Sequence, residues 1–524
     1  MLKNQKRILI MSLLALALLL SACASNNTNP GSKSNNTSAD NNVPGSSDAS
    51  SEDTTNESSN VPVKLEPLQV ELVVGYDGVE FPQAGNDAQK AIEEYTNTKL
   101  DITAYPGSTL HELLPTMIAS DELPMVVGFG GSQLSKTYMI NAMDSGVFCD
   151  LTDYIDNYPN ISEISDITYK SYLRDGRIYG LPKERGLVRG AVGYRYDWIQ
   201  NLGLEEPKTV DDLYNLMVAF TQNDPDGNGL NDTYGSCNNP TDPFAIFLGA
   251  PNEWKYENGE MIKDNFTEEH MQALDMTRKL YSLGVIHPEY SIHSRSQYEE
   301  LWTEGKAGMY FNINNFAQYD MADPKAEVHV NGVFPSDKGT FTSAGTGHNG
   351  VLAISTAKVK DEVTLKRILQ FFDDLGDQEM CNLLVLGIEG VHYTVSDNVA
   401  NPIEDMQDDL NQKIYMPYAA PIAVCYPDTR TIPVKRTYLQ ARILEVLEEN
   451  LPYAVPNPTL GLISETYNSS GADLDTLIAD AETQYIMGKI TKEQYFDQLE
   501  TWKERGGIKI AEEYAEAYAE REGK

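Results

Sequence analysis

The chain has 524 residues, of which 78 are acidic and 40 basic, giving a formal net charge of −38 at pH 7. A chain of this length exceeds what one hydrophobic core normally organises, so we expect two lobes together with tails. A strongly negative surface repels phosphate backbones, and the composition therefore argues against nucleic-acid binding.

A signal peptide is predicted over residues 1–22, where basic residues precede an apolar run, 8–20, that is too short to span a bilayer as a stable helix. The sequence Leu20-Ser21-Ala22-Cys23 is similar to a bacterial lipobox, in which the cysteine carries lipid such as palmitate and becomes the first mature residue. The alternatives are an ordinary signal peptide cut near Ala22 and an uncleaved anchor. Cys23 is thus the predicted lipidation site.

Residues 23–66 are predicted to form a disordered tether, because Ser, Asn, Asp and Thr dominate and aromatic residues are absent. A flexible coil of about forty residues has a root-mean-square reach of roughly 35 Å. We therefore expect this segment to link the membrane to the folded part. The other cysteines, Cys149, Cys237, Cys381 and Cys425, form no CxxC pair and fix no disulfide connectivity, and we interpret them as free, mostly buried thiols.

The first globular stretch alternates strand and helix patterns. Strands are expected at 70–75, 100–105 and 125–130, with helical patterns at 86–96 and 110–119 between them. This order predicts a doubly wound parallel sheet, whose ligand crevice lies beyond the carboxyl ends of the strands.

A crossing between the lobes is predicted around 175–198. The glycine-rich turn at 175–182 suits a hairpin, and the short extended run 192–196 leads into a helix, so residues 184–189 are expected near the cleft floor. Further helices are expected at 209–220, 268–283 and 363–375. The C-terminal part is predicted to be helical, with Phe496, Leu499 and Trp502 on one face and Trp502 docking its helix.

A calcium-type loop is predicted at 224–235. Oxygen side chains occupy its positions one, three, five and nine, glycine occupies position six, and a backbone carbonyl serves at position seven. Gly235 stands at position twelve, where a bidentate glutamate is expected, and Thr233 offers a substitute oxygen. The alternative is an Asx-rich surface turn. The predicted ligands of a structural Ca²⁺ are Asp224, Asp226, Asn228, Leu230, Asp232 and Thr233.

No catalytic motif is recognised. Residues 345–350 match GxGxxG by letters but precede a strand instead of opening a helix, and GxSxG, GxxxxGK[ST] and HExxH are absent from the sequence. A glycosidase needs only two carboxylates at any positions, so that alternative stays open.

Several segments together carry a family resemblance, in order, over 68–520. The segments are 20–23, 175–182, 194–198, 207–209, 224–232, 249–254, 305–309, 387–393 and 502–507. Together they resemble family 1 extracellular solute-binding lipoproteins of Gram-positive bacteria, of the LipO-like type that serves carbohydrate ABC importers.

The resemblance implies an α/β, two-lobed, periplasmic-binding-protein-like fold of type II with three hinge crossovers and a helical C-terminal extension. Lobe 1 is expected to comprise 67–190 and 349–395, and lobe 2 to comprise 191–348 and 396–524. Calcium is also implied, because a related alginate-oligosaccharide-binding protein has a similar loop with a glutamate at the position of Thr233.

The implied function is capture of an oligosaccharide by hinge closure and its delivery to ABC permease subunits, by a monomer that is lipid-anchored at the extracellular face of the cell membrane and is not an enzyme. Aromatic faces stack on sugars, although core packing is the alternative for each ring. The alternatives for the whole protein are a secreted glycan-active hydrolase and a peptide-binding or signalling lipoprotein. The predicted ligand contacts are Tyr76, Phe129, Arg185, Trp254, Tyr310 and Tyr393.

Overall fold

The computed structural model describes residues 65–76, 78, 80–313 and 321–523. The predicted signal peptide, Cys23 and nearly all of the predicted tether lie outside the described residues. Within the described residues, no helix combines the length and the apolar character that crossing a membrane requires.

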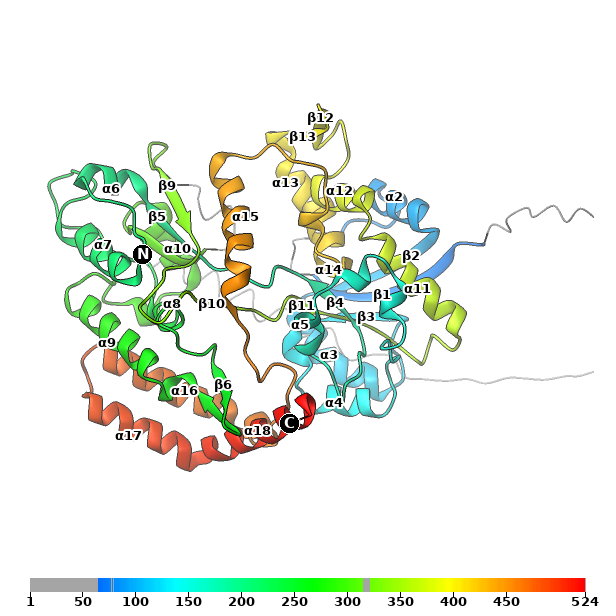
Figure 1. Ribbon diagram of the computed structural model, residues 1–524. Helices are drawn as coiled ribbons and strands as arrows, with labels where there is room; N and C mark the ends of the chain where they lie inside the picture. The colour runs from blue at the N-terminus through cyan, green and yellow to red at the C-terminus, as the bar shows by residue number, and fades with distance from the viewer. Residues whose placement is uncertain (1–64, 77, 79, 314–320, 524) are drawn as a thin grey trace, which may run out of the picture. The chain divides into compact units, whose positions relative to one another are not determined.

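The first sheet has five strands in the order β2-β1-β3-β11-β4 (Figure 1). β1 (Leu68–Gly75) runs parallel to β2 (Thr98–Tyr105) and to β3 (Val126–Phe129), as the alternating pattern predicts. β11 (His348–Ile354) returns antiparallel between β3 and β4 (Leu181–Glu184). The sheet is therefore mixed and not wholly parallel as predicted, because β11 runs antiparallel to its neighbours.

Helices cover this sheet. Asn86 caps α2 (Asp87–Thr96), since its side chain accepts the Gln89 N–H at 3.0 Å. The other helices around this core are α3 (Gly107–Ala119), α4 (Thr137–Asp144), α5 (Asp166–Lys170), α11 (Glu362–Asp374) and α12 (Gln378–Leu386).

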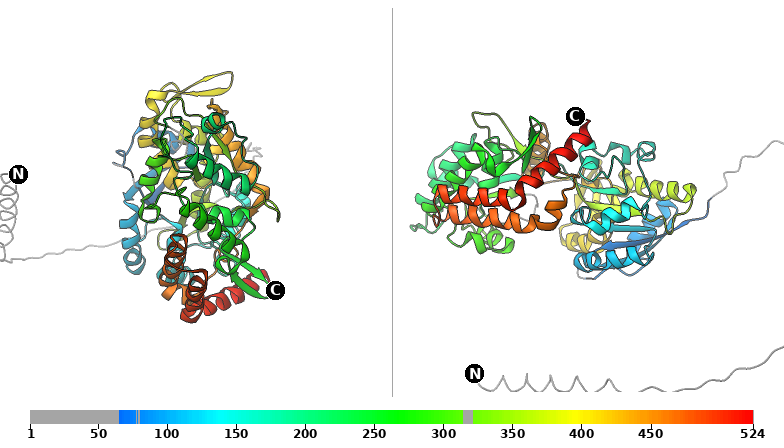
Figure 2. Two further views of the ribbon diagram at one scale, coloured as in Figure 1. Left: turned by 90° about the vertical axis from the view of Figure 1, so that its left-hand side faces the viewer. Right: turned by 90° about the horizontal axis from the view of Figure 1, so that it is seen from below.

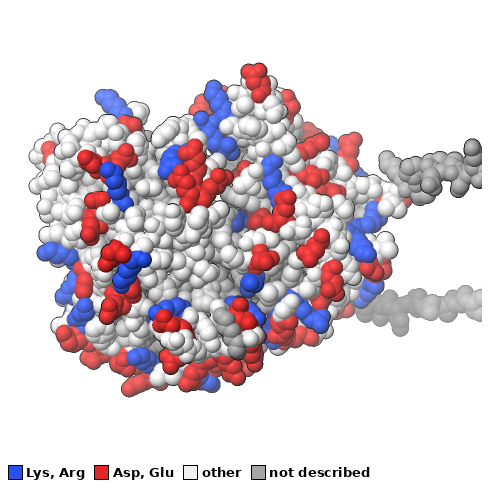
Figure 3. Space-filling view, in the orientation of Figure 1, with Lys and Arg blue, Asp and Glu red and all other residues white. Residues whose placement is uncertain are grey.

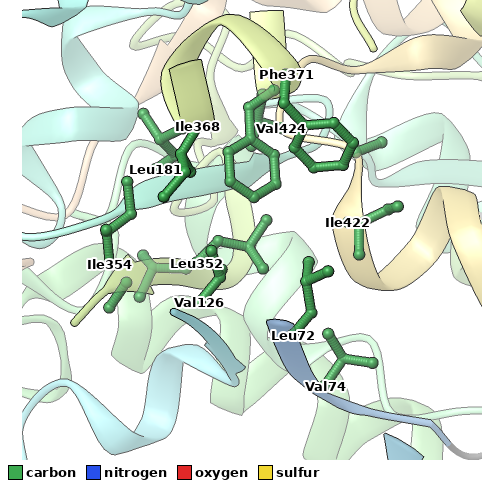
Figure 4. Close-up of a cluster of buried hydrophobic side chains, with 14 of the residues drawn as sticks. Leu72, Val74, Val126, Leu181, Leu352, Ile354, Ile368, Phe371, Ile422 and Val424 are labelled. Carbon is green, nitrogen blue, oxygen red and sulfur yellow. The ribbon is translucent and has the colours of Figure 1, made fainter. Parts of the chain in front are cut away.

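The first core gathers strand and helix side chains from distant parts of the chain, as Figure 4 shows. Leu72 and Leu352 of the sheet face Phe371 of α11, and all three are at most 1% exposed. Ile422 and Val424 pack in the same cluster. The chain reaches them through α13 (Gln407–Leu410), the π-helix Asn411–Ala419 and α14 (Ala420–Ile422), of which Ile422 is the last residue. The expected start of the second part of lobe 2 at 396 is therefore too early, because the apolar residues of 410–425 are buried against the first core.

The second sheet is antiparallel, with the order β8-β5-β9. Its strands are β5 (Ala191–Arg195), β8 (Met309–Ile313) and β9 (Val328–Asn331). The helices around it are α6 (Tyr196–Leu202), α7 (Val210–Gln222), α8 (Thr241–Phe247), α9 (Glu268–Ser282), α10 (Arg295–Thr303) and α15 (Tyr438–Asn450).

Three C-terminal helices, α16 (Glu465–Ile486), α17 (Lys492–Trp502) and α18 (Ile508–Glu522), pack against the hairpin of β6 (Trp254–Glu257) and β7 (Glu260–Lys263) and against α9 (Figure 2). The prediction that Trp502 docks its helix is confirmed, because its ring lies 6.2 Å from that of Trp254 and 5.4 Å from that of Phe266. The prediction for Phe496 is wrong: it is 44% exposed, and Tyr495 fills the buried position.

The chain passes three times between the two sheets. The first crossing, 185–190, joins β4 to β5, and the second, 344–347, joins β10 (Thr342–Ser343) to β11. Backbone hydrogen bonds tie these two crossings together, from Arg185 N to Gly347 O (2.9 Å) and from Gly345 N to Leu187 O (2.7 Å). The third crossing runs from the 3-10 turn Pro427–Thr429 to α15. Smaller pairs are β12 (Tyr393–Ser396) with β13 (Val399–Pro402), and β10 with β14 (Ala454–Val455).

The surface is acidic without one dominant patch on the face that Figure 3 shows. Acidic side chains are spread over this face and interspersed with Lys and Arg. On this face the negative charge is therefore distributed and not gathered at one site.

Candidate functional site

A cavity of about 890 Å³ lies where the crossings, the first core and the C-terminal helices meet. Its size falls in the range of small-molecule sites. From the first part of the chain it is lined by 130–135 after β3, by 171–174, and by Arg185. From the rest of the fold it is lined by parts of α8, the β6–β7 hairpin, 457–463 and α16.

One side of the cavity offers hydrogen-bond donors; we call Arg185 and His348 the donor wall. The guanidinium of Arg185 contacts Asn349 Oδ1 at 3.5 Å and pairs with no carboxylate within 4.0 Å in the described part of the chain. Burial, and then the charge of Arg189, lowers the pKa of Arg185. An arginine whose charge is not compensated by protein is available to an acceptor on a ligand.

His348 is a buried donor, with 4% of its surface exposed. Its Nδ1 accepts the Gly350 N–H at 3.0 Å, which places the ring proton on Nε2. Burial, followed by the charge of Arg185, lowers the pKa of His348 to about 4, so the ring is neutral at pH 7. Among the described residues Nε2 has no hydrogen-bond partner. A buried polar atom of this kind needs an acceptor, which a ligand in the cavity can supply.

Another part of the cavity lining is rich in carboxylates; we call Asp242, Glu253, Asp264 and Glu482 the acidic wall. Packing of protein around the Asp242 carboxyl group removes water from it and raises its pKa to about 6, although the residue as a whole is exposed. The negative charge of Glu482 raises the pKa of Asp242 further. Burial also raises the pKa of Glu253, whose Oε2 accepts from Asn457 Nδ2 at 3.1 Å.

His270 and Lys263 partly balance the acidic wall. His270, only 2% exposed, lies 2.7 Å from Glu482 Oε1 through Nε2 and 3.7 Å from Asp264 through Nδ1. Lys263 Nζ lies 3.6 Å from Asp264 and 5.5 Å from the centroid of the Trp254 ring. Four carboxylates thus face two basic groups, which leaves acceptor oxygens for hydroxyl groups of a ligand.

Two of the six predicted contact residues, Arg185 and Trp254, line this cavity. The other four, Tyr76, Phe129, Tyr310 and Tyr393, are 2–8% exposed and do not line the cavity, in contrast to the prediction. Tyr76 donates its hydroxyl to Glu80 O at 3.0 Å and packs on Phe81. The ring of Phe129 lies 6.4 Å from that of Phe148.

The remaining two predicted contacts are also core residues. Tyr310 donates to Glu299 Oε1 at 2.8 Å and packs beside Trp302. Tyr393 belongs to a small cluster with Leu386 and Ala400. All four rings are buried by neighbouring side chains and not exposed to the cavity.

Sequence reasoning missed His348, Asp242 and Glu482. The available signal for His348 was a histidine between glycines just before a strand, in a segment set aside because it is not a dinucleotide loop. Glu482 lies within an acidic helix, where nothing local distinguishes it from a solvated residue.

The calcium-type loop brings three carboxylates together. Asn228 Nδ2 donates to Asp226 Oδ2 (2.9 Å) and to Asp232 Oδ1 (3.1 Å), while Asp224 Oδ2 accepts the Gly229 N–H at 3.0 Å. Burial raises the pKa of Asp226, and the hydrogen bond to Asp224 and the charges of Asp232 and Asp224 raise it further. Asp224 Oδ1 is buried and has no partner in the described part of the chain. An orphaned carboxylate oxygen among like charges fits a bound cation.

Thr233 is a correction to the predicted ligand set. Its side chain is 3% exposed, and its hydroxyl donates to Phe220 O at 2.6 Å, away from the loop. The loop therefore depends on the other five predicted residues. The four cysteines are free and buried, as predicted.

Two sheet-centred cores, three crossings and a cavity beside the crossings define a two-lobed binding protein. The chain belongs to the bacterial extracellular solute-binding protein family, which it matches over residues 79–373.

The chain is similar to two proteins of Bacillus subtilis strain 168. It is 33% identical to the polygalacturonan/rhamnogalacturonan-binding protein YtcQ, over 82% of this chain and 88% of that one. It is 30% identical to lipoprotein LipO, over 84% and 90%. A structure of the Streptococcus pneumoniae substrate-binding protein FusA, an EF-hand mutant in complex with fructo-nystose, shares the fold with a TM-score of 0.60 and 19% identity, covering 87% of this chain and 99% of that one. YtcQ and FusA are named as binding proteins.

Proposed function

We propose that this protein captures an oligosaccharide in the cavity and presents it to the permease of an ABC importer. The observation that carries the proposal is the presence of a donor wall and an acidic wall in the lining of one cavity. Sugar hydroxyl groups both donate and accept hydrogen bonds, so such a cavity can satisfy both roles of a sugar ring. Trp254 adds an aromatic surface at the same cavity.

An acidic plant-type oligosaccharide is the ligand class that we favour. The name of YtcQ as a polygalacturonan/rhamnogalacturonan-binding protein supports this choice. Within this chain, Arg185 supplies a positive charge that the described carboxylates leave uncompensated within 4.0 Å. The donor wall would take the carboxylate of a uronate, and the acidic wall would take hydroxyl groups.

Titration calorimetry on the mature protein tests the proposal. We expect saturable binding of an oligosaccharide from a panel that contains oligogalacturonates, fructooligosaccharides and short peptides. Absence of binding by every sugar, with binding by a peptide, would favour the peptide-binding alternative.

Hinge closure is the proposed mechanism. Ligand contacts on both walls bind the closed form more tightly than the open form, and ligand therefore shifts the population toward closure. We propose that one lobe comprises 67–190 and 348–435, because Ala400 exchanges backbone hydrogen bonds with Pro433 and Lys435. The other lobe then comprises 191–347 and the residues after 436. Small-angle scattering with and without ligand should show a smaller radius of gyration on binding.

A structural calcium ion is proposed for the loop at 224–235. Asp224, Asp226, Asn228 and Asp232 would hold it by side-chain oxygens and Leu230 by its carbonyl, and the ion would neutralise carboxylates that otherwise repel one another. The EF-hand named for FusA supports this assignment. A melting temperature that is the same in calcium and in chelator would exclude it.

A glycan hydrolase is the second candidate, because the raised pKa of Asp242 beside another carboxylate is what a general acid needs. The relatives are binding proteins, and we propose that this chain is likewise not an enzyme. Release of reducing sugar over time by wild type, and its loss in Asp242→Asn, would reverse this assignment.

We also propose that the protein is anchored at the extracellular face of the membrane through lipid on Cys23 and that it is a monomer. The names of the family and of LipO support the location. Cys23→Ala should move the protein from the membrane fraction to the medium. Light scattering should give the mass of one chain.

A further inference from the structure

A cluster of histidine and carboxylate side chains lies outside the cavity and the calcium-type loop. His287, Glu289 and His293 each offer one ligand atom, and these atoms all lie within 4.8 Å of one another. The two imidazole rings are 4.4 Å apart between centroids, with 37° between their planes. These three side chains come from one short segment between α9 and α10.

The backbone holds this segment in a preformed turn. Its start is fixed to the fold, because Gly235 N donates to Val285 O at 2.9 Å. A 3-10 turn, Tyr290–Ile292, then returns the chain, with Tyr290 N donating to His287 O at 3.0 Å. The histidine side chains therefore meet without any long loop having to be ordered by a ligand.

The side chains of the cluster have one hydrogen bond among the described residues, which the Glu289 N–H donates to His287 Nδ1 at 3.1 Å. His293 Nδ1 is buried and has no hydrogen-bond partner in the described part of the chain. Glu289, which is exposed, forms no ion pair within 4.0 Å among the described residues. The nearest other ring is that of Tyr234, 4.9 Å from His287. Two imidazoles and a carboxylate thus lie close enough to share one ion, and His293 Nδ1 is the buried atom among them that lacks a partner in the described part of the chain.

We propose that His287, Glu289 and His293 form a site for a divalent transition-metal ion, with Zn²⁺ as the expected ion. Two imidazole nitrogens and one carboxylate oxygen are a ligand set that zinc accepts, with water in the fourth position. Calcium and magnesium prefer oxygen ligands only. This site and the calcium-type loop therefore select different metals.

Metal binding requires one local exchange. His287 Nδ1 accepts the Glu289 N–H at 3.1 Å, which places the ring proton on Nε2. Coordination through Nδ1 displaces that N–H, and coordination through Nε2 requires the proton to move to Nδ1. Either route replaces one backbone hydrogen bond with a metal–nitrogen bond. The bound ion then ties the end of α9 to the start of α10.

The test uses the mature chain without a histidine tag, stripped of metal and titrated with ZnCl₂ by calorimetry. We expect one zinc per chain at this site and a higher melting temperature in zinc. His293→Ala should weaken zinc binding about tenfold or more, since even the loss of an outer partner of a metal ligand costs about that much. Ser291→Ala, an exposed change in the same turn, should leave zinc affinity unchanged.

Two further measurements keep the test decisive. Glu289→Gln keeps the size of the side chain and should also weaken zinc binding. It replaces His293→Ala as the test if that variant does not fold. Co²⁺ should give the visible bands of a four-coordinate site in wild type and not in either variant. Equal zinc affinity in wild type and in the folded variant, or the absence of zinc binding by wild type, would overturn the proposal.

Discussion

Replacing Arg185 by glutamine separates the binding role of the donor wall from its role in the fold. Burial and the neighbouring charge of Arg189 both disfavour the charged form of Arg185, as its lowered pKa records. Removing that charge therefore relieves repulsion in the free protein. We expect the melting temperature of Arg185→Gln to be equal to or slightly above that of wild type.

The expected loss of affinity depends on the charge of the sugar. A hydrogen bond to a charged group contributes about 1.5–3 kcal/mol, and a neutral one about 0.5–1.5 kcal/mol. At about 1.4 kcal/mol per tenfold change in Kd, a uronate that uses Arg185 should bind about 10- to 150-fold more weakly to the variant. A neutral oligosaccharide of the same length should lose less affinity, because the guanidinium then meets an uncharged hydroxyl group in place of a carboxylate.

Calorimetry with an oligogalacturonate and with its methyl-esterified form measures both losses on one scaffold. Arg189→Gln is the matched control, because it removes the same charge close by and does not line the cavity. The contact argument requires a large loss in Arg185→Gln, a small one in Arg189→Gln, and a larger loss for the acid than for the ester. Equal losses in the two variants would refute it in favour of a long-range field.

Three other changes address the rest of the molecule. Asp224→Asn should abolish the stabilisation by calcium, which is about 2.7 kcal/mol when calcium is at about 100 times its Kd. Wild type should therefore melt at a higher temperature than the variant in calcium, and the two should melt alike in chelator. Burial lowers the pKa of His270, but its hydrogen bond to Glu482 and the nearby negative charges outweigh burial and raise the pKa above 6.5. The stabilisation by His270 is therefore fully present below pH 6.5 and is lost as the pH rises through the folded-state pKa. Urea denaturation should show the difference in unfolding free energy between wild type and His270→Gln closing over that range. Trp502→Ala should cost about 3–5 kcal/mol of unfolding free energy, whereas Phe496→Ala, an exposed change on the same helix, should cost far less; similar losses would contradict the packing.

Local features were predictable from the sequence because short-range chemistry determines them. The cap at Asn86 and the carboxylates of the loop at 224–232 follow from residues within a few positions of one another. Thr233 was not predictable in the same way. Whether its hydroxyl faces the loop depends on how the loop packs on the preceding helix, and the Phe220 carbonyl captures it.

Features built from distant segments were not predictable. An aromatic residue near a strand end can point into the cleft or into the core, and Tyr310 and Phe129 show that alternation alone does not decide. The return to the second core was expected too early for a related reason. Residues 410–425 carry no sequence signal that names which of two apolar cores they cover.

The position of the donor wall links binding to the hinge. Arg185 begins the first crossing, and its backbone N–H donates to Gly347 O of the second crossing at 2.9 Å. His348 follows that crossing directly as the first residue of β11, and its Nε2 is without a partner among the described residues. A ligand group that accepts from both side chains would therefore bridge the start of the first crossing and the end of the second. In our proposal such a contact would favour one arrangement of the crossings, so the residues that select the ligand would also be the residues through which binding biases closure.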